Sequence, residues 1–218
     1  MDVFARMRER IFHLAEIFEL EKPLEVKKGL SQEVVCLPEG HLIVLDEGTR
    51  YSDLSELVAT CKLGEREVLL GTLFFQRGLS KEEEKFAGMF ANLTYPLRSL
   101  WTWKVMFEYL PENEFVLEFN EMLSFLQPLF GKKVAGGGLP LSPFKVVALK
   151  LIAEEFSDSS ISISGNEEWK TYLSALEELK ERVGVESLVE LPERVNAPYR
   201  VTVEEKPYRH YRVEKKRK

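Results

Sequence analysis

Large apolar side chains recur every three or four residues along the first twenty positions of the chain. Such a spacing places them on one face of an α-helix. We therefore expect an amphipathic helix from Asp2 to about Leu20, which ends before Pro23. The residues of the apolar face are Phe4, Met7, Ile11, Leu14 and Phe18.

Short runs rich in β-branched and apolar residues follow, separated by residues that favour tight turns. This alternation predicts an antiparallel meander in an α+β protein. The strands are expected at residues 33–37, 41–45, 57–63 and 67–76. The next helix is expected to begin at Ser80, because Ser80 and Glu83 have the spacing of a capping box. Pro96 is expected to kink this helix or to end its first part near Tyr95.

Residues 97–130 carry an unusually dense set of large apolar side chains. A helix that is apolar on most sides must be buried, either inside one chain or against a second chain. We expect a buried helical connector that also forms a homodimer, with a purely intramolecular core as the open alternative. Residues 131–140 are rich in glycine but lack a dinucleotide-binding or P-loop pattern, and they predict a hinge. The chain then divides into residues 1–130, the hinge and residues 141–218.

The C-terminal part begins with a helix that Ser142 caps and Pro143 opens. The sequence LSPFKVVALKLIAEEFSDSSIS and the following EEWKTYLSALEELKERVGVESLVEL resemble the helix-turn-helix output domains of the LuxR type over residues 141–191. In this resemblance Thr171, Tyr172 and Leu173 lie in the recognition helix, and residues 183–185 form the motif that ends it. The segment 159–164 alternates Ser and Ile, which favours a strand where that family has its second helix.

A second resemblance, to winged-helix output domains of the OmpR type, includes more of the C-terminus. It implies a strand at 161–164, one long helix at 167–183 and a wing. Two alternating runs, 199–203 and 208–213, flank a turn and predict a hairpin. Tyrosines 199, 208 and 211 alternate with arginines, so the rings are expected to pack inward and the arginines to face phosphates.

Charge restricts which surface could contact DNA. The chain has a net charge of -6, yet residues 192–218 hold nine Lys/Arg against four Asp/Glu. Residues 136–191 hold five Lys/Arg against ten Asp/Glu, so the predicted recognition helix would be repelled by phosphates. Duplex DNA is therefore expected to bind mainly through the hairpin and tail. The candidate nucleic-acid-binding residues are Lys170, Thr171, Ser174, Arg200, Arg209 and Arg212.

Residues 56–75 and 79–86 resemble the closing part of a GAF sensory domain, in which two strands around a glycine lead into a helix. The resemblance implies a compact GAF- or PAS-like module for dimerisation. This sequence lacks the long middle region that forms the ligand pocket in that family. The resemblance therefore identifies no ligand for the module.

The sequence offers no recognisable catalytic or metal site. The three histidines, His13, His41 and His210, lie in no triad or metal-binding spacing, and Cys36 and Cys61 lie in no CxxC motif. We expect both cysteines to be buried strand residues, and we expect no metal and no cofactor. Asp46, Asp53 and Glu56 border loops and could bind a cation, although nothing in the sequence fixes their geometry.

No apolar run reaches the length of a membrane span, and the N-terminus is too charged for a signal peptide, so a cytoplasmic protein is expected. Its 66 charged residues against 8 Asn and Gln are typical of proteins from hot environments. Two non-enzymatic functions remain open, and an enzyme with a novel site is a third possibility. The first is a non-enzymatic, homodimeric transcriptional regulator that binds DNA through a winged helix. The alternative is an adaptor whose acidic winged helix binds a protein partner.

Overall fold

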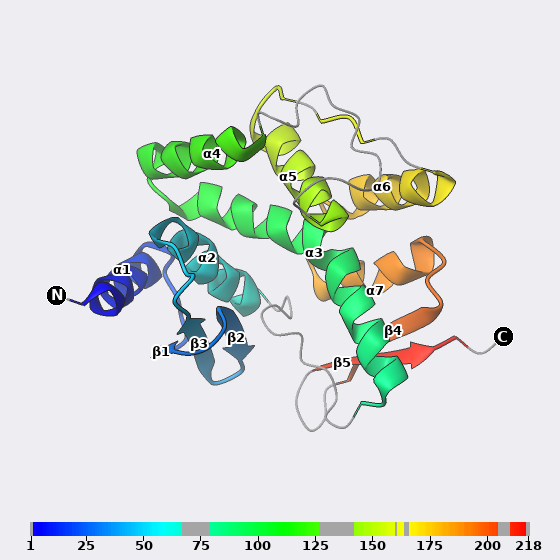
Figure 1. Ribbon diagram of the computed structural model, residues 1–218, viewed down its shortest axis with the longest axis horizontal. Coiled ribbons are helices and arrows are strands. Elements are labelled where there is room, and N and C mark those ends of the chain that lie inside the picture. The colour runs from blue at the N-terminus through cyan, green and yellow to red at the C-terminus, as the bar shows by residue number, and fades with distance from the viewer. Residues whose placement is uncertain are drawn as a thin grey trace. The chain divides into compact units, whose positions relative to one another are not determined.

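The computed structural model describes residues 2–66, 79–126, 142–159, 161–163, 166–204 and 210–216. Within these residues the chain is a mixture of helices and short strands, in agreement with the α+β prediction (Figure 1). None of the described helices is long and apolar enough to cross a membrane. In chain order the elements are α1 (Val3–Ile17), β1 (Leu24–Lys28), β2 (Glu33–Leu37), β3 (Gly40–Leu45), the 3-10 helix η1 (Tyr51–Asp53), α2 (Leu54–Glu65), α3 (Lys81–Tyr109), α4 (Glu112–Leu126), α5 (Pro143–Phe156), α6 (Glu167–Leu179), α7 (Val185–Arg194), β4 (Tyr199–Glu204) and β5 (His210–Lys215).

The chain forms two compact units that do not follow the predicted division. The first unit consists of Met1–Leu73 and Thr102–Glu118, and the second of Phe74–Trp101 and Phe119–Lys218. Helix α3 therefore contributes its first part to the second unit and its last part to the first. The predicted hinge at 131–140 lies outside the described residues.

The first unit is built on a three-stranded sheet with the order β1-β3-β2. β2 and β3 form the expected antiparallel hairpin, whereas β1 was not predicted and pairs in parallel with β3. The buried side chains of β3 alternate, so that His41, Ile43 and Leu45 share one face. α1 packs against α2 and β1, and α2 packs against β2.

The predicted third strand of the meander is wrong, because residues 57–63 lie inside helix α2. The segment is short and apolar at nearly every position, and such runs do not distinguish a buried strand from a buried helix. Leu54, Leu57, Val58 and Cys61 have helical spacing and are all buried. The strand expected at 67–76 lies outside the described residues.

Helix α3 begins as predicted and continues further than predicted. The backbone N–H of Ser80 donates to the Glu83 carboxylate, and the N–H of Glu83 donates to the Ser80 hydroxyl, which confirms the capping box. Of the two alternatives expected at Pro96, a kink or an end near Tyr95, the end is wrong, since α3 continues through Pro96. The Arg98 guanidinium donates to the Ala91 carbonyl at 2.8 Å and supports this part of the helix.

In the described part of the second unit beyond residue 141, the helices α5, α6 and α7 are followed by a hairpin. The predicted cap of α5 is confirmed, because the Lys145 N–H donates to the Ser142 hydroxyl. α6 ends at Leu179, earlier than the expected 183, and a separate helix α7 follows. Residues 161–163 are not a strand, contrary to prediction, whereas the hairpin of β4 and β5 is confirmed.

Candidate functional site

The predicted nucleic-acid-binding residues of α6 lie on its exposed side. Lys170, Thr171 and Ser174 are exposed, while Tyr172 and Leu176 are buried. Lys170 forms an ion pair with Glu167 at 2.6 Å, and the Thr171 hydroxyl donates to the Glu167 carbonyl at 2.9 Å. The ammonium group of Lys170 and the hydroxyl group of Thr171, which were expected to approach DNA, therefore already have partners within α6.

Glutamates dominate the exposed surface around these residues. The cations of α6 and α7 and of the segment between them are Lys170, Lys180, Arg182 and Arg194, and each of them forms an ion pair with a glutamate. We call the exposed glutamates the acidic face of α6 and α7; they are Glu167, Glu168, Glu177, Glu178, Glu181, Glu186 and Glu193.

The arginines of the hairpin face outward as predicted, but they have acidic partners on the hairpin itself. Arg200 contacts Glu214 at 2.9 Å, and Arg212 contacts both Glu204 and Glu214 at 2.8 Å. The hydrogen bonds from Arg200 and the charge of Arg212 lower the pKa of Glu214, so this carboxyl group stays ionised. Arg209 lies outside the described residues. The described part of the hairpin therefore presents paired positive and negative charges on its outer face.

The inner face of the hairpin packs on α3. Tyr199 lies against Phe86 with ring centroids 5.3 Å apart, and Tyr211 lies against Phe90 at 5.0 Å. Both tyrosines are buried, as predicted, and burial raises the pKa of Tyr199 to about 12. Tyr208 lies outside the described residues.

Helix α3 also holds α6 through two hydrogen bonds. The Tyr172 hydroxyl donates to the Leu93 carbonyl at 2.7 Å, and Trp101 Nε1 donates to the Lys180 carbonyl at 2.8 Å at the end of α6. Residues 81–101 are thus part of the same core as the helices and hairpin of the C-terminal unit.

A second group of functional side chains, which the sequence prediction missed, lies in the first unit. The side chains of Cys36, His41 and Cys61 converge, with their possible ligand atoms all within 4.8 Å of one another. Cys36 is partly exposed, whereas Cys61 and the His41 side chain are buried. Among the residues that the structure describes, no other group of His, Cys, Asp or Glu has this arrangement.

The elements explain why these side chains meet. Cys36 and His41 are direct partners across the antiparallel hairpin of β2 and β3, so they lie on the same face of the sheet. Cys61 lies on α2, which packs on that face. Gly64 of α2 permits this close packing, since a Cβ atom there would lie 2.7 Å from the Cys36 sulfur.

A buried carboxylate orients the histidine. Glu65 Oε1 lies 3.1 Å from His41 Nε2 and accepts hydrogen bonds from the backbone N–H groups of Glu21 and Lys22. Its other oxygen lies 3.2 Å from Lys62 Nζ, which also donates to the Glu19 carbonyl. With Nε2 engaged by Glu65, the buried Nδ1 atom of His41 has no hydrogen-bond partner among the described residues.

The proximity of these groups changes their protonation. The hydrogen bond with Cys61 and the neighbouring His41 lower the pKa of the Cys36 thiol to about 6, although burial opposes the change. The contact with Cys36 and burial raise the pKa of Cys61. Burial opposes protonation of His41, but Cys36 and Glu65 together raise its pKa. The two sulfurs therefore titrate as a coupled pair, in which Cys36 loses its proton at a lower pH than Cys61 does.

Part of this cluster could have been found from the sequence. The turn at 38–40 was predicted, and a hairpin that pairs Leu37 with Gly40 necessarily pairs Cys36 with His41. Cys36 is a strand residue, as expected. Cys61 was expected on a strand and instead lies on α2, so its position could not be derived.

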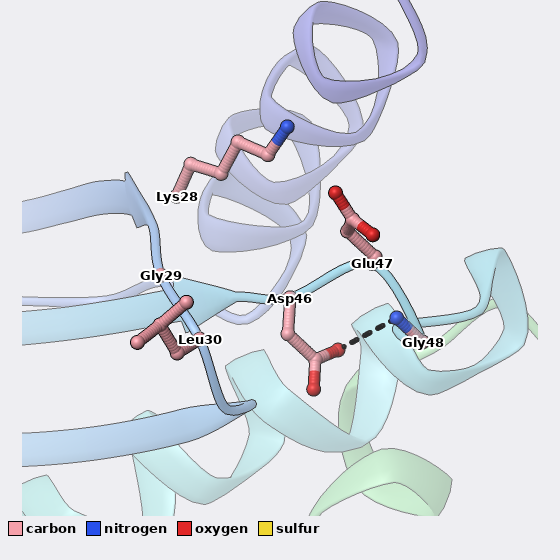
Figure 2. A pocket seen from close by; sticks show the side chains of 6 residues that line it. All are labelled: Lys28, Gly29, Leu30, Asp46, Glu47 and Gly48. Atoms are coloured by element: carbon pink, nitrogen blue, oxygen red, sulfur yellow. Dashed lines mark hydrogen bonds between the residues drawn. The ribbon is translucent and has the colours of Figure 1, made fainter.

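Two of the three acidic residues considered for cation binding, Asp46 and Asp53, form hydrogen bonds within their own loops. A surface depression is lined by Lys28, Gly29, Leu30, Asp46, Glu47 and Gly48 (Figure 2). The Asp46 carboxylate accepts hydrogen bonds from the Thr49 hydroxyl and from the N–H groups of Gly48 and Gln32, which lower its pKa. Asp53 similarly accepts hydrogen bonds from Arg50. These contacts assign both residues a role in loop structure.

No family model, curated protein or solved structure matches this chain. The resemblances to GAF, LuxR-type and OmpR-type domains therefore stay predictions.

Proposed function

We propose that this chain is a non-enzymatic adaptor that binds a basic protein surface through the acidic face of α6 and α7. The observation that carries the proposal is the charge of this face. Its glutamates outnumber the cations, and each cation of these helices already has a glutamate partner. A surface of one sign attracts a partner of the opposite sign and repels phosphates.

The scaffold of the second unit supports this role. Burial of Tyr172, Leu176 and Leu179 fixes which side of α6 is exposed. The hydrogen bonds from Tyr172 and Trp101 connect this helix to α3. The acidic face is thus presented on a rigid element, which lowers the entropy lost when a partner binds.

Binding of a lysine-rich helical peptide to the full chain, measured by fluorescence anisotropy, tests this proposal. We expect binding that weakens as salt is added, and a loss of at least about tenfold in Glu168→Lys/Glu177→Lys. Glu9→Lys/Glu16→Lys changes the net charge equally in the first unit, on exposed positions of α1. Equal weakening in both variants would show that net charge alone attracts the peptide and would contradict the proposal.

A second candidate is the DNA-binding transcriptional regulator, which one observation favours. The order of three helices followed by a hairpin, α5, α6, α7 and β4–β5, is the order expected of a winged helix. In this function Arg200, Arg209 and Arg212 would contact phosphates together with Lys170, Thr171 and Ser174. The hairpin arginines would first have to exchange Glu204 and Glu214 for phosphate oxygens.

The same anisotropy assay with a random DNA duplex separates the two candidates. A regulator would bind the duplex at low salt, and substitution of Arg200, Arg209 and Arg212 by Ala would reduce the steepness of the salt dependence by about one for each lost phosphate contact. For the adaptor we expect no duplex binding even at low salt.

Homodimerisation is a further part of the proposal. It is supported by large apolar side chains that remain exposed in the connector, namely Phe107 with 61% and Leu117 with 71% of their surface accessible. Sedimentation equilibrium should show a dimer for the unaltered chain and a monomer for the double variant Phe107→Ser/Leu117→Ser. The control Val3→Ser/Leu30→Ser removes two apolar side chains elsewhere in the first unit that are at least as exposed as Phe107, and it should leave the dimer intact.

A further inference from the structure

We propose that Cys36, His41 and Cys61 form a site for one divalent transition-metal ion of the zinc type. The ion would have two sulfur ligands and one nitrogen ligand, and a water molecule or another small ligand would take the fourth position. This site is independent of the acidic face and of the proposed adaptor function.

The backbone brings the three ligands together before any metal is bound. Two of them are opposite each other on the β2–β3 hairpin, and the third is on the helix that packs over it. Their ligand atoms lie within 4.8 Å of one another. In a tetrahedral zinc site ligand atoms lie roughly 3.3–3.8 Å apart, so small side-chain rotations would complete the geometry.

The surroundings of His41 point to a ligand. Metal-bound histidines usually donate their second ring N–H to a carboxylate, which fixes the tautomer and leaves the other nitrogen free to coordinate. Glu65 accepts from Nε2 in this way and is itself held by Glu21, Lys22 and Lys62. The Nδ1 atom is buried and makes no hydrogen bond with the described residues, which would be costly unless another group binds there.

The ligand set selects the class of metal. Sulfur and imidazole favour zinc and similar ions over Mg²⁺ and Ca²⁺, which prefer oxygen ligands. The Cys36 thiol donates a weak hydrogen bond to the Thr60 carbonyl at 3.9 Å, and a bound metal ion would replace this contact. Because Cys36 is partly exposed, it gives the open coordination position access to solvent.

Titration of the full chain with Co²⁺ tests the site directly. The protein is treated with a chelator, kept reduced and titrated while its absorption spectrum is recorded. We expect one Co²⁺ per chain, with sulfur-to-cobalt charge-transfer absorption and the intense visible bands of tetrahedral Co²⁺, both of which Zn²⁺ removes by displacement. The chain has only two cysteines, so sulfur-to-cobalt absorption can come from no other residue.

Variants assign the ligands and the positioning residue. Cys36→Ser, Cys61→Ser and His41→Gln should each weaken Co²⁺ binding by more than about a hundredfold, and Glu65→Gln by about 10–100-fold through the orientation of His41. His13→Gln, an exposed histidine of α1, is the matched control and should bind as the unaltered chain does. Circular dichroism of each variant separates loss of a ligand from loss of the fold.

The proposal fails if the reduced, unaltered chain shows no sulfur-to-cobalt absorption, or if His41→Gln binds Co²⁺ as tightly as the unaltered chain does. It also fails if the stoichiometry is one ion per two chains, because the ion would then bridge molecules. In air, a disulfide between Cys36 and Cys61 that forms equally fast with and without Zn²⁺ would show that the metal does not bind these sulfurs. The two cysteines would then be a pair that undergoes oxidation, and the proposal would be contradicted.

Discussion

Glu118 is a partly buried carboxyl group of α4 whose pKa is raised in the folded state. Burial raises its pKa to about 7, even though the Ser55 hydroxyl donates to it at 2.5 Å and Arg10 lies nearby. The folded state therefore binds a proton that the unfolded chain releases above its usual pKa of 4.5. The contribution of this group to stability is full below pH 4.5 and is lost as the pH rises to about 7.

We expect Glu118→Gln to remove this pH dependence, since glutamine can still accept the Ser55 hydrogen bond. From pH 5 to pH 8 the free energy of unfolding in urea should fall by on the order of 2 kcal/mol more in the unaltered chain than in the variant. Glu121→Gln, at an exposed position of the same helix, should leave the difference unchanged. Equal pH dependence in Glu118→Gln and the unaltered chain would contradict the prediction.

The Tyr172 hydroxyl is a second group whose effect can be measured alone. Tyr172→Phe removes the hydrogen bond to the Leu93 carbonyl and leaves that oxygen without this donor, at a cost of about 1–2 kcal/mol in the free energy of unfolding. Tyr51→Phe removes an exposed hydroxyl and should change stability by less than about 0.5 kcal/mol. Urea unfolding of the two variants decides whether the contact holds α6 to α3.

At the scale of elements, the packing of α2 on β2 depends on a glycine. An alanine usually stabilises a helix by about 1 kcal/mol relative to glycine. Gly64→Ala should instead destabilise the protein by about 1–2 kcal/mol, because the added Cβ would lie 2.7 Å from the Cys36 sulfur and 2.9 Å from its Cβ atom. Gly88→Ala in α3 is the matched control, since nothing lies within 4 Å of its added Cβ, and it should be stabilising. Thermal unfolding should show a lower midpoint temperature than that of the unaltered chain for Gly64→Ala and a higher one for Gly88→Ala.

For the whole molecule, the predicted C-terminal domain does not contain its own complete core. A fragment of residues 142–218 lacks Phe86, Phe90 and Trp101 of α3, against which the hairpin and α6 pack. We expect this fragment to bind a hydrophobic dye and to unfold without a cooperative transition, and a fragment of residues 79–218 to regain near-ultraviolet circular dichroism. A cooperative transition in the shorter fragment would contradict this division of the chain.

Helices with a clear periodic pattern and the turns with strong local signals were predicted well. α1, the caps at Ser80 and Ser142, and both hairpins follow from spacing and local hydrogen bonding, which act over a few residues. Residues 57–63 were assigned wrongly because so short a run of mostly apolar residues fits a buried strand as well as a buried helix. The same error concealed the cluster, since Cys61 reaches Cys36 and His41 only from a helix.

The sequence by itself determined the α+β class, the acidic character of α6 and the antiparallel hairpin of β2 and β3. Each of these depends on residue type or on contacts a few positions apart. The tertiary structure alone decided that β1 pairs in parallel with β3, that α3 completes the C-terminal core, and that Cys61 and Glu65 join His41. These contacts join residues that are distant in sequence, so they depend on how the elements pack and on which buried polar groups can satisfy one another.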